Sequence, residues 1–368
     1  MTTVQLQAPA TTRKFWSGMT LFCIALLIAP VVASQLGGNY WVRVIDFALL
    51  YIMLALGLNI VVGYTGLLDM GFIAFYAVGA YLAALLASPH LAEVFPILAV
   101  WFPDGLHTSY LLIVPAAALV AAVCGILLGA PTLKLRGDYL AIVTLGFGEI
   151  IRILMRNLDR PVNITNGAKG ITGVDTLNLF GLKFSGVYHW IGFKVPALWL
   201  WYYLLMLVIV AIIFVCLRLQ HSRIGRAWHA IREDEDVARA MGINVRNYKL
   251  LAFAMGASFG GVAGALFGAF QGFVSPESFT LQESIAVLAM VVLGGMGHIP
   301  GVILGAVLLT ALPELLRSQA APVQQMLFGT VLIDPEILRQ LFYGLALVLV
   351  MLVRPSGIWP VRHKEVKA

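Results

Sequence analysis

Long apolar segments with almost no charge constrain the fold of this chain more than any other feature. Residues 15–42, for example, contain no Asp, Glu, Lys or Arg. About 20 apolar residues in a helix span the hydrocarbon core of a bilayer. Only 11% of the 368 residues are charged, against about 25% in soluble domains. The pattern predicts a polytopic membrane protein and excludes a soluble enzyme, a disordered chain, a disulfide scaffold and a coiled coil.

The distribution of these segments predicts an all-α fold of about ten transmembrane helices. The predicted helices cover residues 15–36, 44–62, 66–87, 108–130, 139–156, 197–217, 250–272, 281–297, 300–316 and 337–353. Together they form one transmembrane domain over residues 15–353, between tails at 1–14 and 354–368. For the first segment, a signal peptide cleaved near Val31-Val32-Ala33 is the alternative to an uncleaved helix.

Positive charge is unevenly distributed over the loops between these segments. The polar loop 218–249 and both tails hold the larger share of the 24 Lys and Arg residues. Cytoplasmic loops carry such an excess, so both termini are predicted to be cytoplasmic and the loop 157–196 to be periplasmic. The net charge of +6 is explained by this bias, and we expect no nucleic-acid partner.

No pattern of residues in the sequence is typical of an active site. GxxxxGK[ST], HExxH and CxxC are all absent, and Cys23, Cys124 and Cys216 lie in apolar segments as packed thiols. We therefore expect no metal ion or nucleotide bound by this chain, and a membrane enzyme is disfavoured.

Ionisable residues inside the predicted helices are candidates for function because burying a charge in a bilayer is costly. Glu149 and Arg152 are three residues apart on one helical face and can form a structural ion pair or line a cavity. Asp69 follows the Gly63–Gly66 break and can cap the next helix or contact substrate. The glycine-rich stretch 294–301 is either a tight turn or a broken helix of the kind that transporters use.

Two further patterns concern helix packing. Glycines recur about every four residues between Gly256 and Gly268, which favours close approach of helices. In the loop 218–249, Ser222 and Gly242 are suitable caps for a short amphipathic helix. Its apolar positions are Ala227, Trp228, Ile231, Ala238 and Met241. This face needs a cover, either the membrane surface or a docked cytoplasmic protein, and the acids at 233–236 disfavour anionic lipid.

The segment from Glu235 to Gly242 resembles the EAA-xxx-G coupling loop of ABC importer permeases, although Asp236 and Val237 replace the two alanines. Longer segments resemble the LivM family of branched-chain amino acid permeases. These segments are GLNIVVGYTGLLD at 57–69, GFIAFYAVGAY at 71–81, LRGDYLAIVTLGFGEIIR at 135–152, NITNG at 163–167, GGMG at 294–297 and RPSGI at 354–358. The resemblance extends over about residues 44–360.

The resemblance implies one permease subunit of an ABC importer in the bacterial inner membrane. A second, homologous permease would pair with it, two cytoplasmic ATPase subunits would hold ATP and Mg, and a periplasmic binding protein would deliver leucine, isoleucine or valine. The ATPase-coupling residues would be Arg226, Trp228, Ile231, Glu235, Asp236, Ala238, Met241 and Gly242. The candidate translocation path comprises Asn59, Tyr64, Asp69, Glu149, Arg152, Gly294, Gly295 and Gly297.

Two other transport functions remain open at this point. A related permease for urea or short-chain amides has a similar layout, although Leu68-Asp69-Met70-Gly71-Phe72 is more similar to the amino acid branch. A secondary carrier driven by an ion gradient would require no partner subunits, and the acidic helix near Glu235 would then be unexplained.

Overall fold

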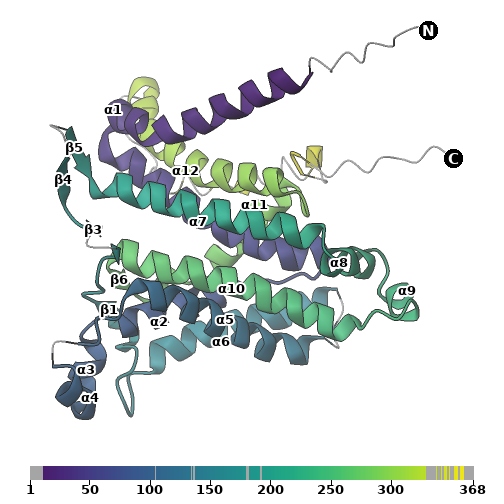
Figure 1. Ribbon diagram of the computed structural model, residues 1–368, viewed down its shortest axis with the longest axis horizontal. Coiled ribbons are helices and arrows are strands. Elements are labelled where there is room, and N and C mark those ends of the chain that lie inside the picture. The colour runs from purple at the N-terminus through teal and green to yellow at the C-terminus, as the bar shows by residue number, and fades with distance from the viewer. Residues whose placement is uncertain are drawn as a thin grey trace, which may run out of the picture.

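The fold is seen in a computed structural model, and the elements keep the labels of Figure 1. The structure describes residues 11–103, 105–133, 135, 137–179, 182–190, 193–328, 337, 341, 344–345, 348, 352–354 and 357–359. The α-helices are α1 Thr11–Asn59, α2 Ile73–Leu86, α3 His90–Val94, α4 Pro96–Trp101, α5 Tyr110–Thr132, α6 Asp138–Asn157, α7 Ala197–Gln220, α8 Arg223–Glu233, α9 Glu235–Ala240, α10 Val245–Gln271, α11 Leu281–Gly294 and α12 Ile299–Phe328.

Shorter elements connect these helices. The π-helix η1 covers Ile60–Tyr64, and the 3₁₀ turns η2 and η3 cover Gly167–Lys169 and Pro276–Ser278. The strands are β1 Ile171–Thr172, β2 Asn178–Leu179, β3 Leu182–Lys183, β4 Val187–Trp190, β5 Phe193–Pro196 and β6 Phe273–Val274. They pair antiparallel as β1 with β6, β2 with β3 and β4 with β5.

Six helical stretches within the described residues are long and apolar enough to cross a membrane. They are Gly38–Tyr64, Tyr110–Thr132, Ala197–Gln220, Val245–Gln271, Pro276–Gly294 and Ile299–Gln319. Two shorter apolar helices cover Leu26–Gln35 and Ile73–Leu86. The chain is therefore a mostly helical, multi-pass membrane protein, and most of the predicted tenth segment, 337–353, lies outside the described residues.

Several predicted boundaries differ from the structure for local reasons. The segments 15–36 and 44–62 belong to one helix, α1, which contains Gly38 at φ +71°; a glycine tolerates this conformation because it has no Cβ. Its two limbs run in different directions (Figure 1). The third segment becomes helical only at Ile73. The predicted segment 139–156 forms α6, but its charged residues keep it outside the six apolar stretches.

The helix α10 lies at the centre of the packing, against α5, α2 and α1. A Cβ atom on Gly264 would lie 2.1 Å from the carbonyl oxygen of Tyr76, and one on Gly261 would lie 2.5 Å from that of Ala117. The small residues let the backbones approach this closely. The predicted role of the glycine pattern is thus confirmed.

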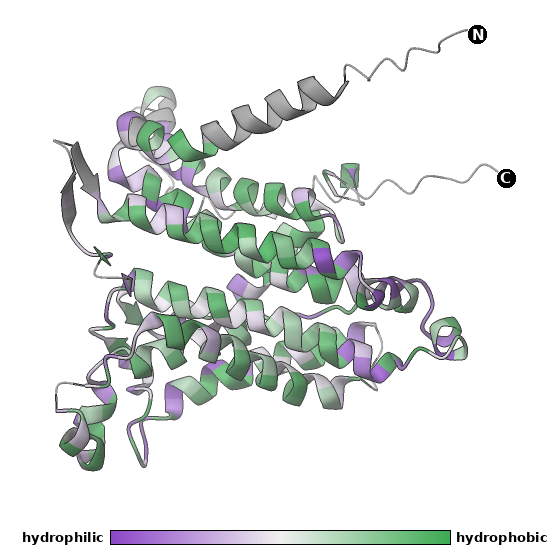
Figure 2. Ribbon diagram, in the orientation of Figure 1, coloured by the Kyte–Doolittle hydropathy of each residue, from purple (hydrophilic) through white to green (hydrophobic). Residues whose placement is uncertain are grey.

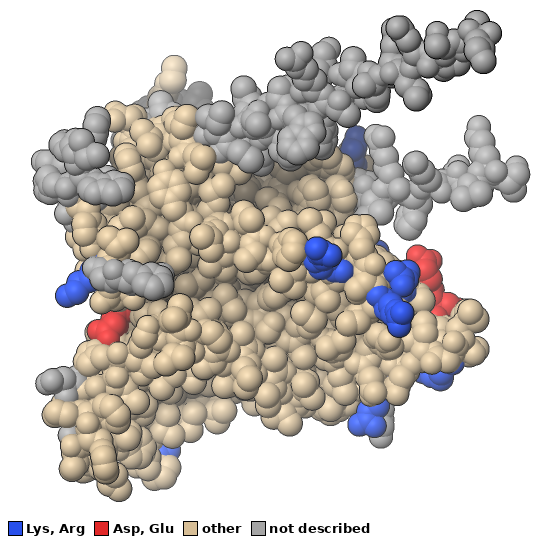
Figure 3. Space-filling model, viewed as in Figure 1, with Lys and Arg blue, Asp and Glu red and all other residues tan. Residues whose placement is uncertain are grey.

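Charge is concentrated at the two ends of the molecule. The sides of the helices are apolar in Figure 2, and the face seen in Figure 3 carries Lys, Arg, Asp and Glu mainly toward its ends. The helices α8 and α9 lie at one end, while the short strands and α3 and α4 lie at the other (Figure 1). An apolar band between charged ends is the arrangement that a bilayer requires.

Candidate functional site

The predicted amphipathic helix of the loop 218–249 is two helices, α8 and α9. The Ser222 hydroxyl accepts hydrogen bonds from the backbone N–H groups of Ile224 and Gly225, at 3.1 and 3.2 Å, as expected of an N-cap. Gly242 has φ +84° and follows the C-cap of α9, as predicted. The helix is interrupted at Asp234, because the carboxylate accepts hydrogen bonds from the Asp236 and Val237 N–H groups and so starts α9.

The apolar face of α8 is covered by the chain itself. Trp228 is fully buried, and Ile231 and Ala238 are also buried. The Trp228 indole donates a hydrogen bond to the Tyr248 carbonyl at 2.8 Å and stacks on Tyr64, with ring centroids 6.3 Å apart. The expectation that this face requires an external partner is therefore wrong. Periodicity reveals that a helix has an apolar face, but not which surface covers it.

Three elements meet beneath α8. The Arg232 guanidinium donates a hydrogen bond to the Gly63 carbonyl at 2.5 Å. The Gly297 N–H donates to the Asn59 side-chain carbonyl at 2.8 Å. These bonds connect α8 to η1, and the end of α1 to the turn between α11 and α12. We call the following residues the junction cluster: Asn59, Gly63, Tyr64, Trp228, Arg232 and Gly297.

The backbone of η1 is adapted to this contact. A Cβ atom on Gly63 would lie 2.0 Å from Asn59 Oδ1 and 2.6 Å from the Gly297 nitrogen, so only glycine fits. A π-helical turn is rare and often occurs at functional sites, because it changes the direction of backbone groups within a helix. The break at this glycine was predicted from the sequence, but the contact of Gly63 with Arg232 was not.

The outer surface of α9 remains accessible within the described chain. Val237 and Met241 are 58% and 79% exposed, and Arg226, Asp236 and Gly242 are also exposed. Glu235 lies inward and forms ion pairs with Lys249 at 2.7 Å and Arg239 at 3.0 Å. The predicted coupling residues therefore divide into a buried group that fixes α8 and α9 and an exposed group.

Asp69 does not cap α2. Its Oδ1 accepts a hydrogen bond from the Gly71 N–H at 2.9 Å, whereas Phe72 occupies the N-cap position of α2 without a side-chain bond. The carboxylate therefore orders the turn before the helix. In the same segment, the Ser284 hydroxyl donates to the Met70 carbonyl. The segment 65–72 thus connects to α11.

Glu149 and Arg152 form the predicted ion pair, with Oε1 and Nη2 2.5 Å apart. Arg152 also lies 3.7 Å from Glu277. The Glu149 side chain is 37% exposed, and neither residue lines the cavity described below. The geometry therefore favours the structural interpretation of this pair over a place in a cavity.

The glycine-rich stretch after α11 is a tight turn between two separate helices. Gly295 and Gly297 have φ +113° and +85°, which glycine alone adopts readily. A Cβ atom on Gly294 would lie 2.3 Å from the Gly301 carbonyl oxygen. The backbone of Ile358 and Trp359 donates hydrogen bonds to the carbonyls at the end of α11, at 2.8 and 3.2 Å. This geometry favours the tight turn over the broken helix.

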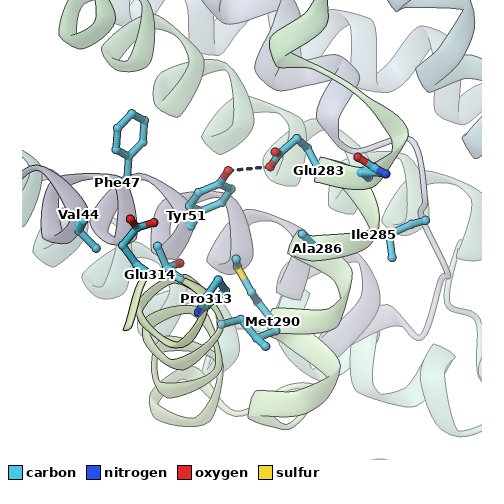
Figure 4. A pocket seen from close by; sticks show the side chains of 12 residues that line it. Val44, Phe47, Tyr51, Glu283, Ile285, Ala286, Met290, Pro313 and Glu314 are labelled. Atoms are coloured by element: carbon cyan, nitrogen blue, oxygen red, sulfur yellow. Dashed lines mark hydrogen bonds between the residues drawn. The ribbon is translucent and has the colours of Figure 1, made fainter. Parts of the chain in front are cut away.

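A cavity of about 520 Å³ lies between α1, α11 and α12 (Figure 4). Its lining residues are Val44, Phe47, Tyr51, Gln282, Glu283, Ile285, Ala286, Met290, Leu309, Thr310, Pro313 and Glu314. The Tyr51 hydroxyl donates a hydrogen bond to Glu283 at 2.6 Å. The cavity was not predicted from the sequence. The signal was present, because Glu283 and Glu314 are carboxylates inside the apolar segments 281–297 and 300–316.

Within the described ranges, no three His, Cys, Asp or Glu side chains gather closely enough to hold a metal ion.

Comparison with known proteins identifies the family. Residues 40–351 match the family described as branched-chain amino acid transport system / permease component. The chain belongs to this permease family. It is 42% identical over 360 residues to the high-affinity branched-chain amino acid transport system permease protein LivM of Escherichia coli (strain K12), covering 94% of this chain and 76% of that protein.

Two further relatives give the range of similarity within the permease family. The LivM permease protein of Salmonella typhimurium is 42% identical over 362 residues, covering 94% of this chain and 76% of that protein. The Escherichia coli (strain K12) permease protein LivH is 25% identical over 311 residues, covering 84% of this chain and 90% of that protein. No solved structure matches the chain. The junction cluster and the cavity both lie within the matched residues 40–351.

A chain of this family is a transport component, so the activity to be explained is passage of a solute and not catalysis. The junction cluster and the exposed surface of α9 lie at one end of the permease, and the cavity lies nearer the other end of α11.

Proposed function

We propose that this chain is the LivM-type permease subunit of an ABC importer that moves leucine, isoleucine and valine across the bacterial inner membrane. The observation that carries the proposal is the 42% identity to LivM over 94% of the chain. ATP hydrolysis on separate subunits drives the transport. The absence of GxxxxGK[ST] from the sequence agrees with this division of labour.

The proposed assembly contains a second, homologous permease, two cytoplasmic ATPase subunits that bind ATP and Mg, and a periplasmic amino acid binding protein. Similarity to both LivM and LivH permeases supports a pair of related permease subunits. In the proposed topology ten helices cross the membrane and both termini are cytoplasmic. The Lys and Arg residues near α8 and α9 support this orientation.

The proposed coupling step begins at the exposed surface of α9. An ATPase subunit contacts Val237 and Met241, and its closure on ATP moves α8 and α9 together, because Ile231 of α8 and Ala238 of α9 are buried in one apolar cluster. Arg232 and Trp228 transmit the displacement to η1 and the α11–α12 turn through the contacts of the junction cluster. The switch between outward-facing and inward-facing states follows from the shift of α1 and α11.

The first experiment measures uptake of radiolabelled leucine in cells deleted for this chain and complemented with it. An ATP-driven importer is supported if the chain restores uptake, if vanadate blocks this uptake, and if a protonophore leaves it intact. Uptake that follows the ion gradient contradicts the proposal in favour of a secondary carrier. Uptake of urea or acetamide in place of leucine changes the substrate assignment.

A second variant set tests the docking surface. Met241→Glu places a charge on an apolar, exposed position and disturbs no described internal contact, so the ATPase subunits should no longer co-purify. Met326→Glu is the control, because Met326 is also exposed, at 90%, and lies on α12 away from α9. Normal transport by the Met241 variant would contradict docking at α9.

A further inference from the structure

The cavity between α1, α11 and α12 combines an apolar wall with an acidic one. Phe47, Met290 and Leu309 contribute to the apolar wall. Glu283 and Glu314 are the charged residues of the lining, and Tyr51 lies between their helices (Figure 4). Sites for small ligands are about 300–1,000 Å³, mostly apolar, with a few polar groups that fix orientation. The volume of about 520 Å³ and the composition fit this description.

The two carboxylates have different surroundings. Glu314 has a cationic neighbour on its own helix, because Arg317 Nη1 lies 3.5 Å from its Oε1. Glu283 accepts a hydrogen bond from the neutral Tyr51 hydroxyl, and the ion pairs of the described residues do not include it. An ionised carboxylate has about four acceptor sites. Glu283 therefore has capacity for a cationic hydrogen-bond donor inside the cavity.

We propose that this cavity binds the transported amino acid, with the Glu283 carboxylate receiving the ammonium group and the wall around Met290 receiving the aliphatic side chain. The inference rests on the proposed function for the identity of the substrate. The Gln282 side-chain amide supplies donors for the substrate carboxylate. A charge-assisted hydrogen bond to Glu283 selects a ligand with an ammonium group over an isosteric fatty acid.

The position of the cavity connects binding to coupling. Glu283 is in the first turn of α11, and the same helix ends at Gly294, beside the junction cluster. Fourteen residues of α11 span about 20 Å at 1.5 Å per residue. A shift of α11 imposed at the junction cluster therefore reaches Glu283 at the other end of the same helix.

The test uses the assembled importer in phosphatidylcholine vesicles, with Cys23, Cys124 and Cys216 replaced by Ala and with Ala286→Cys as a reporter in the cavity wall. The measured quantity is the rate at which a thiosulfonate reagent modifies the reporter. Leucine and 3-methylbutylamine should slow modification, whereas 4-methylpentanoate, which lacks the ammonium group, should not. In Glu283→Gln the leucine concentration needed for protection should rise about tenfold or more, the size of one charge-assisted hydrogen bond.

Glu93→Gln is the matched control, because Glu93 is exposed on α3 and does not line the cavity; it should leave protection unchanged. Equal protection by 4-methylpentanoate, or unchanged protection in Glu283→Gln, would overturn the inference. A third outcome would also overturn the inference: phosphatidylethanolamine slows modification of the reporter cysteine while leucine has no effect. The cavity would then be a lipid site.

Uptake separates this inference from the proposed function. If the parent complex accumulates leucine with ATP and binding protein but leucine does not protect the reporter, only the cavity assignment fails. If the parent complex accumulates no leucine, the proposed function fails.

Discussion

The two ends of α11 differ in how their polar groups are satisfied. At the end near Gly297, Arg232 donates to a carbonyl of η1 and the Gly297 N–H donates to Asn59, while the Tyr64 hydroxyl is buried without a hydrogen-bond partner among the described residues. At the other end, Glu283 faces a cavity and accepts a hydrogen bond from the neutral Tyr51 hydroxyl. Bonds between elements carry a displacement from one element to the next, whereas a carboxylate with unused acceptor sites leaves bonding capacity for a ligand.

A substitution that separates η1 from the α11–α12 turn should have the largest effect. Gly63→Leu places atoms where Asn59 Oδ1 and the Gly297 nitrogen lie, so η1 and the α11–α12 turn cannot meet. We expect leucine uptake to fall at least about tenfold, since overpacking costs about 1–3 kcal/mol or more. Uptake per amount of protein in the membrane measures the effect. Gly146→Leu is the control, because a Cβ there meets open space; equal loss in both variants would contradict the prediction.

Removing the bond between α8 and η1 should have the next largest effect. In Arg232→Ala the Gly63 carbonyl loses its charged donor, a change worth about 1.5–3 kcal/mol. We expect ATP hydrolysis to continue while its stimulation by the binding protein falls several-fold. ATPase rates with and without binding protein provide the measurement. Arg246→Ala removes an exposed Arg from α10 and should leave stimulation intact; stimulation retained by Arg232→Ala would show that α8 does not act through Gly63.

A smaller effect is expected where the two short helices meet. Asp234→Ala removes the side chain that caps α9, at a cost of about 1 kcal/mol. Amide hydrogen exchange over residues 235–240 should become faster, while exchange in α8, whose cap is Ser222, should not change. Unchanged exchange in α9 would mean that its ion pairs, and not the cap, hold it.

The smallest effect is expected for a substitution at Glu314, the second carboxylate of the cavity. Glu314→Gln removes a carboxylate that Arg317 already partly neutralises, so we expect leucine uptake to change by about twofold or less, the range of a weak, partly exposed pair. The measurement compares leucine uptake by the Glu314→Gln and Glu283→Gln variants in vesicles of the same composition. A loss in Glu314→Gln that equals the loss in Glu283→Gln would show that both carboxylates bind the ligand.

Much of the fold could be predicted from hydropathy, because the cost of exposing backbone and charge to lipid acts on each segment separately. The helices α5, α7 and α10 lie where the apolar segments indicated. The caps at Ser222 and Gly242 and the pairing of Glu149 with Arg152 could also be predicted, since each depends on residues a few positions apart.

The candidate site was harder to predict because it depends on contacts between distant residues. Arg232 and Gly63 are 169 positions apart, and Tyr51 and Glu283 are 232 apart. The burial of Trp228 against Tyr64 also follows from tertiary packing. No local periodicity contains this information.

Hydropathy and glycine spacing were enough to predict a multi-pass helical membrane protein, the apolar segments that form α5, α7 and α10, and the glycines that permit close packing. These properties follow from the free energy of transferring each segment from water into the bilayer, and from the absence of a side chain on glycine. The contact of α8 with η1, and the two carboxylates from separate helices that face one cavity, became visible only in the folded chain. Both contacts depend on which helix surfaces meet, and the packing of the whole chain determines those surfaces.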